Sequence, residues 1–161
     1  MLLGMNTKMR KSSRILLAGA VAAGLSVPAL STASATEDTT HDPAATKALY
    51  TQLYDQLQDG TVNRGDALQL GDREATLCMM GNGYGVHGLA VGPNTSCEFG
   101  SEVFAQLIDA HSPSDNIRDL TPVTVNAHSP ITEQDYDMEC VTGQDDLITC
   151  SGGVGAEVYL F

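Results

Sequence analysis

The sequence predicts an α+β fold in which two helices pack on an antiparallel sheet. Three observations support this prediction. Apolar residues recur at helical spacing in two segments, and they alternate with polar residues through the C-terminal segment 123–161. Glycine-rich turns separate the alternating runs, as they do in antiparallel hairpins. Four cysteines in so short a chain are typical of a domain that disulfides stabilise.

Residues 1–35 have the pattern of a secretory signal peptide and are not expected to belong to the fold. A basic segment precedes an apolar run at residues 15–25, and the small-residue motif Ala33-Ser34-Ala35 follows. The apolar run is shorter than the roughly 20 residues that a membrane-spanning helix needs. We therefore expect cleavage after Ala35 and export of the rest of the chain.

The exported chain is expected to consist of a flexible start at residues 36–41 and a single α+β domain at residues 42–161. It holds all 20 acidic residues but four of the eight Lys and Arg, so its formal charge is 4 − 20 = −16. Such a charge argues against nucleic acid and anionic membranes as partners, because both bind basic side chains. No second apolar span or cell-wall sorting motif follows the domain. We expect release to the medium and an extracellular or cell-envelope partner.

The cysteines predict two disulfides, because an even number in a small exported chain is typical of a disulfide framework. Four cysteines allow three pairings. We favour Cys78–Cys97 and Cys140–Cys150, since each bond would join neighbouring elements. In the chain-entropy model each would contribute about 3 kcal/mol to the free energy of unfolding. A zinc site is disfavoured, because the cysteine spacings lack the C-x-x-C pattern and export oxidises thiols.

The first helix is predicted from Asp42 to about Leu57. Asp42 suits the N-cap position and Pro43 the first helical position. Leucines recur every fourth residue over 49–57, which places them on one buried face. Two tyrosines beside these leucines, Tyr50 and Tyr54, are interpreted as aromatic residues at the edge of the core.

A loop at residues 61–72 and then a hairpin are expected after this helix. The hairpin strands are predicted over 74–80 and 84–91, with a turn at Gly81-Asn82-Gly83 because glycine tolerates positive φ. His87 is interpreted as one side chain of this hairpin. No helix follows the glycines directly, and no Lys with Ser or Thr closes a phosphate-binding loop, so we predict no nucleotide site here.

The second helix is predicted over residues 96–110, after a tight turn at Gly92-Pro93-Asn94. Thr95 and Glu98 have the spacing of a capping box. Gly100 is expected to let a strand approach the helix closely. The residues expected on the buried face are Cys97, Phe104, Leu107, Ile108 and His111, with Val103 at its edge.

The C-terminal segment is predicted to form an antiparallel meander after a loop at residues 114–119. Alternating runs place its strands over about 123–128, 135–140, 147–151 and 154–161. We expect one apolar face of this sheet to be covered by the helices.

Three carboxylates, Asp135, Asp137 and Glu139, are expected on one face of a strand in this meander. Calcium takes six to eight oxygen ligands. Alternate side chains on a strand lie about 7 Å apart, however, and the sequence has no EF-hand loop. We interpret these residues as a solvated outer face, with a weak calcium site as the alternative, and we predict no other metal and no cofactor.

No catalytic residues are predicted. The chain has Ser, His and Asp but no Gly-x-Ser-x-Gly turn that would mark a nucleophile, and it has no tryptophan with which to bind sugars. We therefore predict an exported non-catalytic binding or interaction module. The alternatives are a small secreted hydrolase or inhibitor, and a calcium-dependent envelope protein.

Several fragments together resemble a small secreted disulfide-containing module of actinobacteria. They are Val91-Gly-Pro-Asn-Thr-Ser-Cys-Glu-Phe99, Ser129-Pro-Ile-Thr132 with Tyr136-Asp-Met-Glu-Cys140, and Thr149-Cys-Ser-Gly-Gly153 with Ala156-Glu-Val-Tyr159. The resemblance covers about 77–161 and leaves the first helix outside. In that group the module occurs in exported proteins of unassigned function. The resemblance implies export and the favoured cysteine pairing, and it supplies no catalytic residues.

Overall fold

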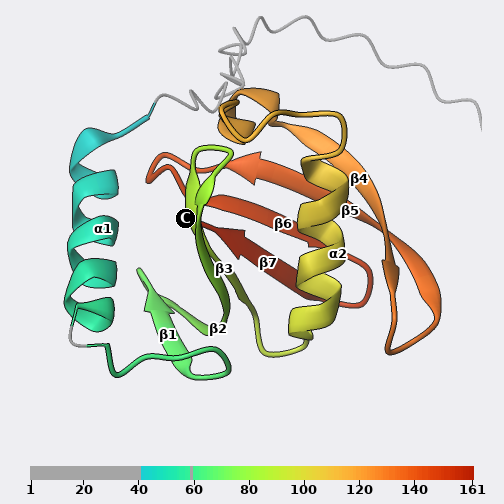
Figure 1. The fold of residues 1–161 in the computed structure, drawn as a ribbon, viewed down its shortest axis with the longest axis horizontal. Helices are drawn as coiled ribbons and strands as arrows, with labels where there is room; N and C mark the ends of the chain where they lie inside the picture. The colour runs from blue at the N-terminus through green and yellow to red at the C-terminus, as the bar shows by residue number, and fades with distance from the viewer. Residues whose placement is uncertain (1–40, 59) are drawn as a thin grey trace, which may run out of the picture. The chain divides into compact units, whose positions relative to one another are not determined.

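A computed structural model of the chain describes residues 41–58 and 60–161 (Figure 1). The predicted signal peptide, its cleavage after Ala35 and most of the flexible start lie outside these residues. The elements are α1 (Pro43–Leu57), β1 (Ala67–Leu70), β2 (Arg73–Gly83), β3 (Val86–Val91), α2 (Cys97–Leu107), the 3-10 helix η1 (Ile117–Leu120), β4 (Val123–Ser129), β5 (Gln134–Thr142), β6 (Ile148–Gly152) and β7 (Ala156–Leu160). The predicted α+β fold class is confirmed.

All seven strands form one antiparallel sheet in the order β1-β2-β3-β7-β6-β5-β4. The predicted hairpin and the predicted meander are therefore parts of one sheet, joined where Ala90 of β3 lies opposite Tyr159 of β7. Local periodicity could not reveal this join, because β3 and β7 are far apart in the chain.

The sheet carries a hydrophobic core on each face, and one helix covers each core (Figure 1). Successive residues of β3 alternate between the cores: Leu89 and Val91 lie in the core under α2, whereas Ala90 lies in the core under α1. Val158 and Tyr159 of β7 alternate in the same way. The expectation that both helices cover one apolar face is therefore wrong.

Helix α1 begins as predicted. The Asp42 carboxylate accepts a hydrogen bond from the Ala44 N–H, and Pro43 is the first helical residue. Leu49 and Leu53 are almost completely buried. Each such leucine contributes about 1.5–3 kcal/mol through the apolar surface it removes from water.

The predicted loop at 61–72 contains the short edge strand β1, so that part of the prediction is wrong. Two glutamines of α1 hydrogen-bond the outer backbone of this strand and of the turn residue that follows it. The Gln56 amide bonds both the N–H and the C=O of Gln69. The Gln52 amide bonds both groups of Gly71 in the same way. These bonds from a distant helix stabilise a strand that, at four residues, is too short to be recognised in the sequence.

The hairpin turn lies at Tyr84-Gly85 and not at the predicted Gly81-Asn82-Gly83, because β2 continues to Gly83. Tyr84 has a φ of 57°. Tertiary contacts hold it there: its N–H donates to the C=O of Pro113, and its ring packs edge-on against Phe104 at 5.9 Å. These contacts, and not the glycines at positions 81 and 83, determine where the turn forms.

The N-cap of α2 is Ser96, whose Oγ accepts a hydrogen bond from the Phe99 N–H at 3.1 Å. The predicted capping box is wrong, because Thr95 accepts instead from the Glu157 N–H of β7. A Cβ on Gly100 would lie 2.6 Å from Val91 Cγ1, which confirms the predicted close approach of a strand.

The buried face of α2 is rotated from the prediction, and the helix ends at Leu107. Val103, placed at the edge of the predicted face, is completely buried, whereas Phe104 and Ile108 are half-buried. The buried residues of α2 are Phe99, Gly100, Val103 and Leu107. The segment predicted as a loop at 114–119 includes the start of η1, whose Ile117 is also completely buried.

Both predicted disulfides are present. Cys78–Cys97 joins β2 to the first turn of α2, and Cys140–Cys150 joins β5 to β6. The Cα atoms of Cys140 and Cys150 lie directly opposite each other at 3.9 Å. The first bond therefore fixes a helix on the sheet, whereas the second fixes the pairing of two strands.

Candidate functional site

The largest apolar hollow described here, which we name the Tyr54 groove, lies between α1 and the β2–β3 hairpin. Its volume is about 590 Å³. Its lining residues are Lys47, Tyr50, Thr51, Leu53, Tyr54, Leu57, Met80, His87 and Phe161. Tyr54 is 62 % exposed and Met80 is 50 % exposed, so much of both side chains lies outside the core. Exposed apolar side chains that border one groove are typical of a binding surface.

Helical spacing produces the α1 wall of the groove. Tyr50, Tyr54 and Leu57 follow one another at intervals of four and three residues, which places them on one side of the helix. Leu53, in the same wall, anchors the helix in the core. The two tyrosines flank the buried leucines as the sequence indicated, and they also line the groove.

The opposite wall comes from the sheet and depends on a local irregularity. The N–H groups of His87 and Gly88 both donate to the C=O of Phe161, so two residues of β3 oppose one residue at the end of β7. A Cβ at Gly88 would clash with the Phe161 ring. The bulge and the glycine together let this ring lie against the hairpin beside Met80.

A smaller apolar hollow of about 270 Å³ is lined by the same hairpin and by residues on the α2 side, including Met79, Tyr84 and Phe104. The consecutive methionines thus line different hollows, Met79 the smaller one and Met80 the Tyr54 groove. Methionine is flexible and adapts to partners of different shape. The end of the hairpin therefore presents an adaptable apolar residue to each hollow.

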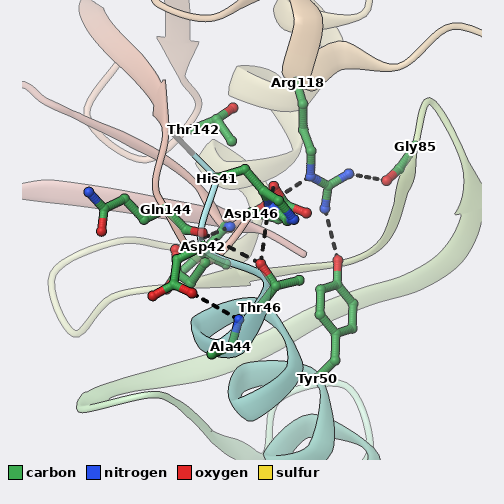
Figure 2. A network of polar contacts seen from close by, with 12 residues as sticks. His41, Asp42, Ala44, Thr46, Tyr50, Gly85, Arg118, Thr142, Gln144 and Asp146 are labelled. Atoms are coloured by element: carbon green, nitrogen blue, oxygen red, sulfur yellow. Dashed lines mark hydrogen bonds and ion pairs between the residues drawn. The ribbon is translucent and has the colours of Figure 1, made fainter. Parts of the chain in front are cut away.

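Arg118 fixes one end of the Tyr54 groove (Figure 2). Its guanidinium donates to the Tyr50 hydroxyl at 2.9 Å, to the C=O of Asp146 at 2.8 Å and to the C=O of Gly85. The hydrogen bonds join α1, the β5–β6 turn and the β2–β3 turn to the η1 helix that carries Arg118. Burial raises the pKa of Tyr50, and the carboxylates of Asp146 and Asp145 add to this effect, whereas Arg118 opposes it.

The β5–β6 turn also holds the start of α1 (Figure 2). His41 Nδ1 lies 2.8 Å from a carboxylate oxygen of Asp146, and the Asp42 N–H donates to the C=O of Gln144. Asp145 lies 3.8 Å from the Arg73 guanidinium. Each carboxylate of this turn therefore has a partner of its own, Asp146 with His41 and Asp145 with Arg73.

The predicted acidic face has its three carboxylates in a row on β5. Asp135, Asp137 and Glu139 are all exposed. Asp135 lies 2.8 Å from Nδ1 of His128, and Asp137 accepts a hydrogen bond from Asn126. Within residues 41–58 and 60–161, no three His, Cys, Asp or Glu side chains lie close enough together to hold a metal ion.

The described histidines do not assemble a hydrolytic triad. Such a triad needs a hydroxyl on one imidazole nitrogen and a carboxylate on the other. Thr46 Oγ1 lies 3.5 Å from His41 Nδ1, but this nitrogen also contacts the carboxylate. Three histidines contact an aspartate through Nδ1, in the pairs His41–Asp146, His111–Asp115 and His128–Asp135. Hydrogen bonds from Nε2 to a hydroxyl are absent from the part of the chain that the structure describes.

Sequence reasoning missed the Tyr54 groove because its walls come from three distant segments. Tyr54, Met80 and Phe161 acquire a shared role through the pairing of β3 with β7 and the packing of α1. Two local signals pointed toward the groove: the tyrosines one helical turn apart in α1, and the paired methionines at the end of a strand.

No helix among the described residues is long and apolar enough to cross a membrane. The resemblance to a secreted actinobacterial module stays a prediction. Comparison of the chain with protein-family models, with curated proteins and with solved structures gives no match.

Proposed function

We propose that the protein is an exported, non-catalytic binding module that acts outside the cell or in its envelope and takes an apolar side chain of a protein partner into the Tyr54 groove. The exposure of Tyr54 and Met80 beside a groove of about 590 Å³ carries this proposal. Covering apolar surface contributes roughly 25 cal/mol per Å². Both side chains would therefore gain from contact with a partner.

The rigidity of the groove walls supports this function, because a site on rigid elements loses little entropy on binding. Leu49 and Leu53 anchor one wall in the core. Cys78, two residues before Met80, connects the other wall to α2 through a disulfide. Met80 itself lies at the exposed end of this wall and remains able to adapt to its partner.

A non-catalytic role is supported by the histidine geometry. Each described histidine–aspartate pair uses Nδ1, and none continues from Nε2 to a hydroxyl within the described residues. The acidic exported chain also favours a partner with basic groups around its apolar anchor, because complementary charges accelerate association.

Affinity capture from the native cell surface, with the oxidised protein as bait, tests the proposal. We expect Met80→Glu to reduce the yield of the captured partner at least tenfold, because it places a charge in the groove. Val154→Glu is the matched control, since Val154 is 88 % exposed and does not line the groove, and it should leave the yield unchanged. Equal capture by both variants, or turnover of generic peptidase, esterase or glycosidase substrates, would overturn the proposal.

A further inference from the structure

Strand β4 is the last strand of the sheet, and its backbone has an open side. Its pairing with β5 shows which residues point their backbone groups outward. Cys140 and Cys150 lie opposite each other at 3.9 Å, the short Cα separation of a pair that exchanges no backbone hydrogen bonds. The backbone groups of Cys140 therefore point away from β6 and toward Val123 of β4. Because this pattern alternates, the N–H and C=O groups of Thr124, Asn126 and His128 point toward the open edge.

Side-chain contacts on the hairpin agree with this assignment. Side chains approach more closely in pairs without backbone hydrogen bonds. Asn126 donates to Asp137 at 2.8 Å across one such pair, and His128 lies 2.8 Å from Asp135 across the next. Outside the sheet ladder, the hydrogen bonds of residues 41–58 and 60–161 include none to the backbone of these β4 residues.

β4 also lacks the features with which proteins usually protect an edge strand. It runs for seven residues, Val123–Ser129, in continuous register with β5. It contains no lysine, no proline and no bulge. Long, regular edges of this kind are templates for an added strand unless a charge, a proline or a covering element blocks them.

A groove of about 390 Å³ lies along this edge, between β4 and the C-terminal end of α2. Beside the polar Gln106, Asp109 and His111, the groove has an apolar lining of Leu107, Leu120, Val123 and Val125, of which the last three are half-buried. An added strand would turn every second side chain toward these residues. Those positions should therefore be apolar.

The remaining side chains of an added strand would lie on the acidic face of the sheet. This face carries Thr124, Asn126 and His128 on β4, followed by three exposed carboxylates on β5. An added strand would lie roughly 10 Å from β5, two strand spacings away. The Debye length at physiological ionic strength is about 8 Å, so long basic side chains that lie back over β4 would interact with these carboxylates. Those positions should therefore be basic.

From this arrangement we infer that β4 is a docking edge for an extended segment of the partner in which basic residues alternate with apolar ones. The inference rests on the proposed binding function and specifies the chemistry of the partner. The segment would form backbone hydrogen bonds with Thr124, Asn126 and His128, as in other cases of strand addition. A second copy of this chain is a poorer occupant, because it would bring an identical row of carboxylates and the same excess negative charge.

Hydrogen exchange and fluorescence anisotropy with a labelled Lys-Val-Lys-Val-Lys-Val-Lys peptide test this inference on the oxidised exported protein. In the free protein the amides of Thr124, Asn126 and His128 should exchange rapidly. Peptide at saturation should slow their exchange at least tenfold. A peptide with Glu in place of Lys should not bind, and 0.5 M salt should weaken the binding of the Lys peptide at least tenfold.

Asn126→Pro is the sharpest variant, because it removes an outward N–H while proline remains tolerated on an edge strand. It should weaken peptide binding at least tenfold, whereas Asn126→Thr, which keeps the N–H, should bind within twofold of the wild type. Near-UV circular dichroism verifies that both variants are folded. Asp137→Asn leaves the backbone intact, so it tests the charge contribution even if Asn126→Pro fails to fold, and it should weaken binding at least threefold.

Three results would overturn the inference: no peptide binding at 1 mM, binding that does not protect these β4 amides, or concentration-dependent protection in the free protein that shows pairing between copies. Affinity capture with the Met80→Glu variant distinguishes failure of this inference from failure of the proposed function. If Asn126→Pro and wild type capture the same partner equally while Met80→Glu does not, the docking edge is wrong and the binding function stands.

Discussion

The two edges of the sheet differ in how their outward backbone groups are hydrogen-bonded. At β1, the side-chain amides of Gln52 and Gln56 hydrogen-bond both backbone groups of Gly71 and Gln69. At β4, no described residue supplies such partners. Glutamines one helical turn apart are spaced by about 6 Å, and alternate residues of a strand by about 7 Å. A helix placed beside a strand can therefore replace a neighbouring strand with two side chains.

This comparison shows that an edge strand is not open merely because it lies last in the sheet. β1 is short, and the outer backbone groups of Gln69 and of the adjacent Gly71 are hydrogen-bonded within the fold. β4 is longer, regular and uncovered, and a groove and an acidic face border it. The contacts at β1 serve the stability of the fold, whereas β4 keeps unused backbone hydrogen-bonding capacity, where we propose that a partner docks.

The largest expected loss of stability comes from removing the disulfide nearest to the open edge, and it should distinguish the two ends of the sheet. The double substitution Cys140→Ala with Cys150→Ala should lower the free energy of unfolding by about 3 kcal/mol, because the unfolded chain loses a closed loop. Urea denaturation measures the loss. Hydrogen exchange should accelerate in β5 and β6 before it does in β1 and β2.

The matched variant removes Cys78–Cys97 by the same substitutions. It should lose a similar amount of stability, since its loop of 19 residues is of comparable length. Its exchange should accelerate around β2 and α2 instead. Identical exchange patterns in the two double variants would show that neither bond acts on one part of the sheet.

Gln52 and Gln56 form a glutamine cover over the edge at β1. Removing this cover should leave the outer backbone at β1 exposed to water, as it is at β4. Gln52→Ala with Gln56→Ala leaves both outer groups of Gln69 and the N–H of Gly71 to water, while the Gly71 C=O keeps its bond from the Gln69 side chain. We expect a loss of about 2 kcal/mol in the free energy of unfolding. Hydrogen exchange at these two amides should become as fast as at the open edge. Asp55→Ala on the same helix is the control and should change stability by less than about 0.5 kcal/mol. Unchanged exchange at Gln69 and Gly71 would show that the amides of the two glutamines are dispensable.

Alkaline pH should weaken the half of the sheet that α1 covers. Burial and a hydrogen bond to Glu157 raise the pKa of Tyr159 to about 12. Between pH 10 and 12 the unfolded chain loses this proton while the folded chain keeps it, so stability is complete below pH 10 and falls as the pH rises. The loss should reach about 1 kcal/mol at pH 11.

Thermal unfolding of wild type and Tyr159→Phe from pH 9 to pH 11 measures this effect. The variant loses a hydrogen bond at every pH, but its melting temperature should fall less steeply in this interval. Parallel curves for the two proteins would mean that Tyr159 does not cause the alkaline loss.

The smallest expected change in the free energy of unfolding comes from a substitution on the open edge strand β4. Thr124→Lys adds the charge that β4 lacks, and it should change the free energy of unfolding by less than about 0.5 kcal/mol. It should nevertheless reduce aggregation on heating, measured as turbidity, because charged edges resist pairing. Thr149→Lys is the control on the same face of the interior strand β6. Equal turbidity for both variants would show that the edge does not drive aggregation.

Features that short stretches of sequence determine were predictable. Asp42 and Pro43 marked the start of α1, alternation revealed the C-terminal strands, and neighbouring elements suggested the disulfide pairing. Features that depend on distant partners were not. β1 needs the glutamines of α1, and the true role of Thr95 depends on the N–H of Glu157.

The candidate site also has one part that the sequence predicted and one part that it did not. The acidic residues of β5 could be placed on one face from their spacing, and they lie there. The Tyr54 groove required the merger of two predicted sheets into one, which no periodicity of Tyr54 or Met80 encodes. Tertiary packing, and not the chemistry of single residues, determines where the groove forms.

The glutamine cover on β1 also sets the stoichiometry of strand addition. Growth of an open-ended filament requires two free edges on every subunit, so that each arrival leaves a place for the next. Because β1 is covered, copies of this chain could pair only β4 to β4, and such a pair would leave no open edge for a third copy. Copies of this chain joined through β4 should therefore stop at pairs, and the chain can expose one pairing edge without polymerising through it.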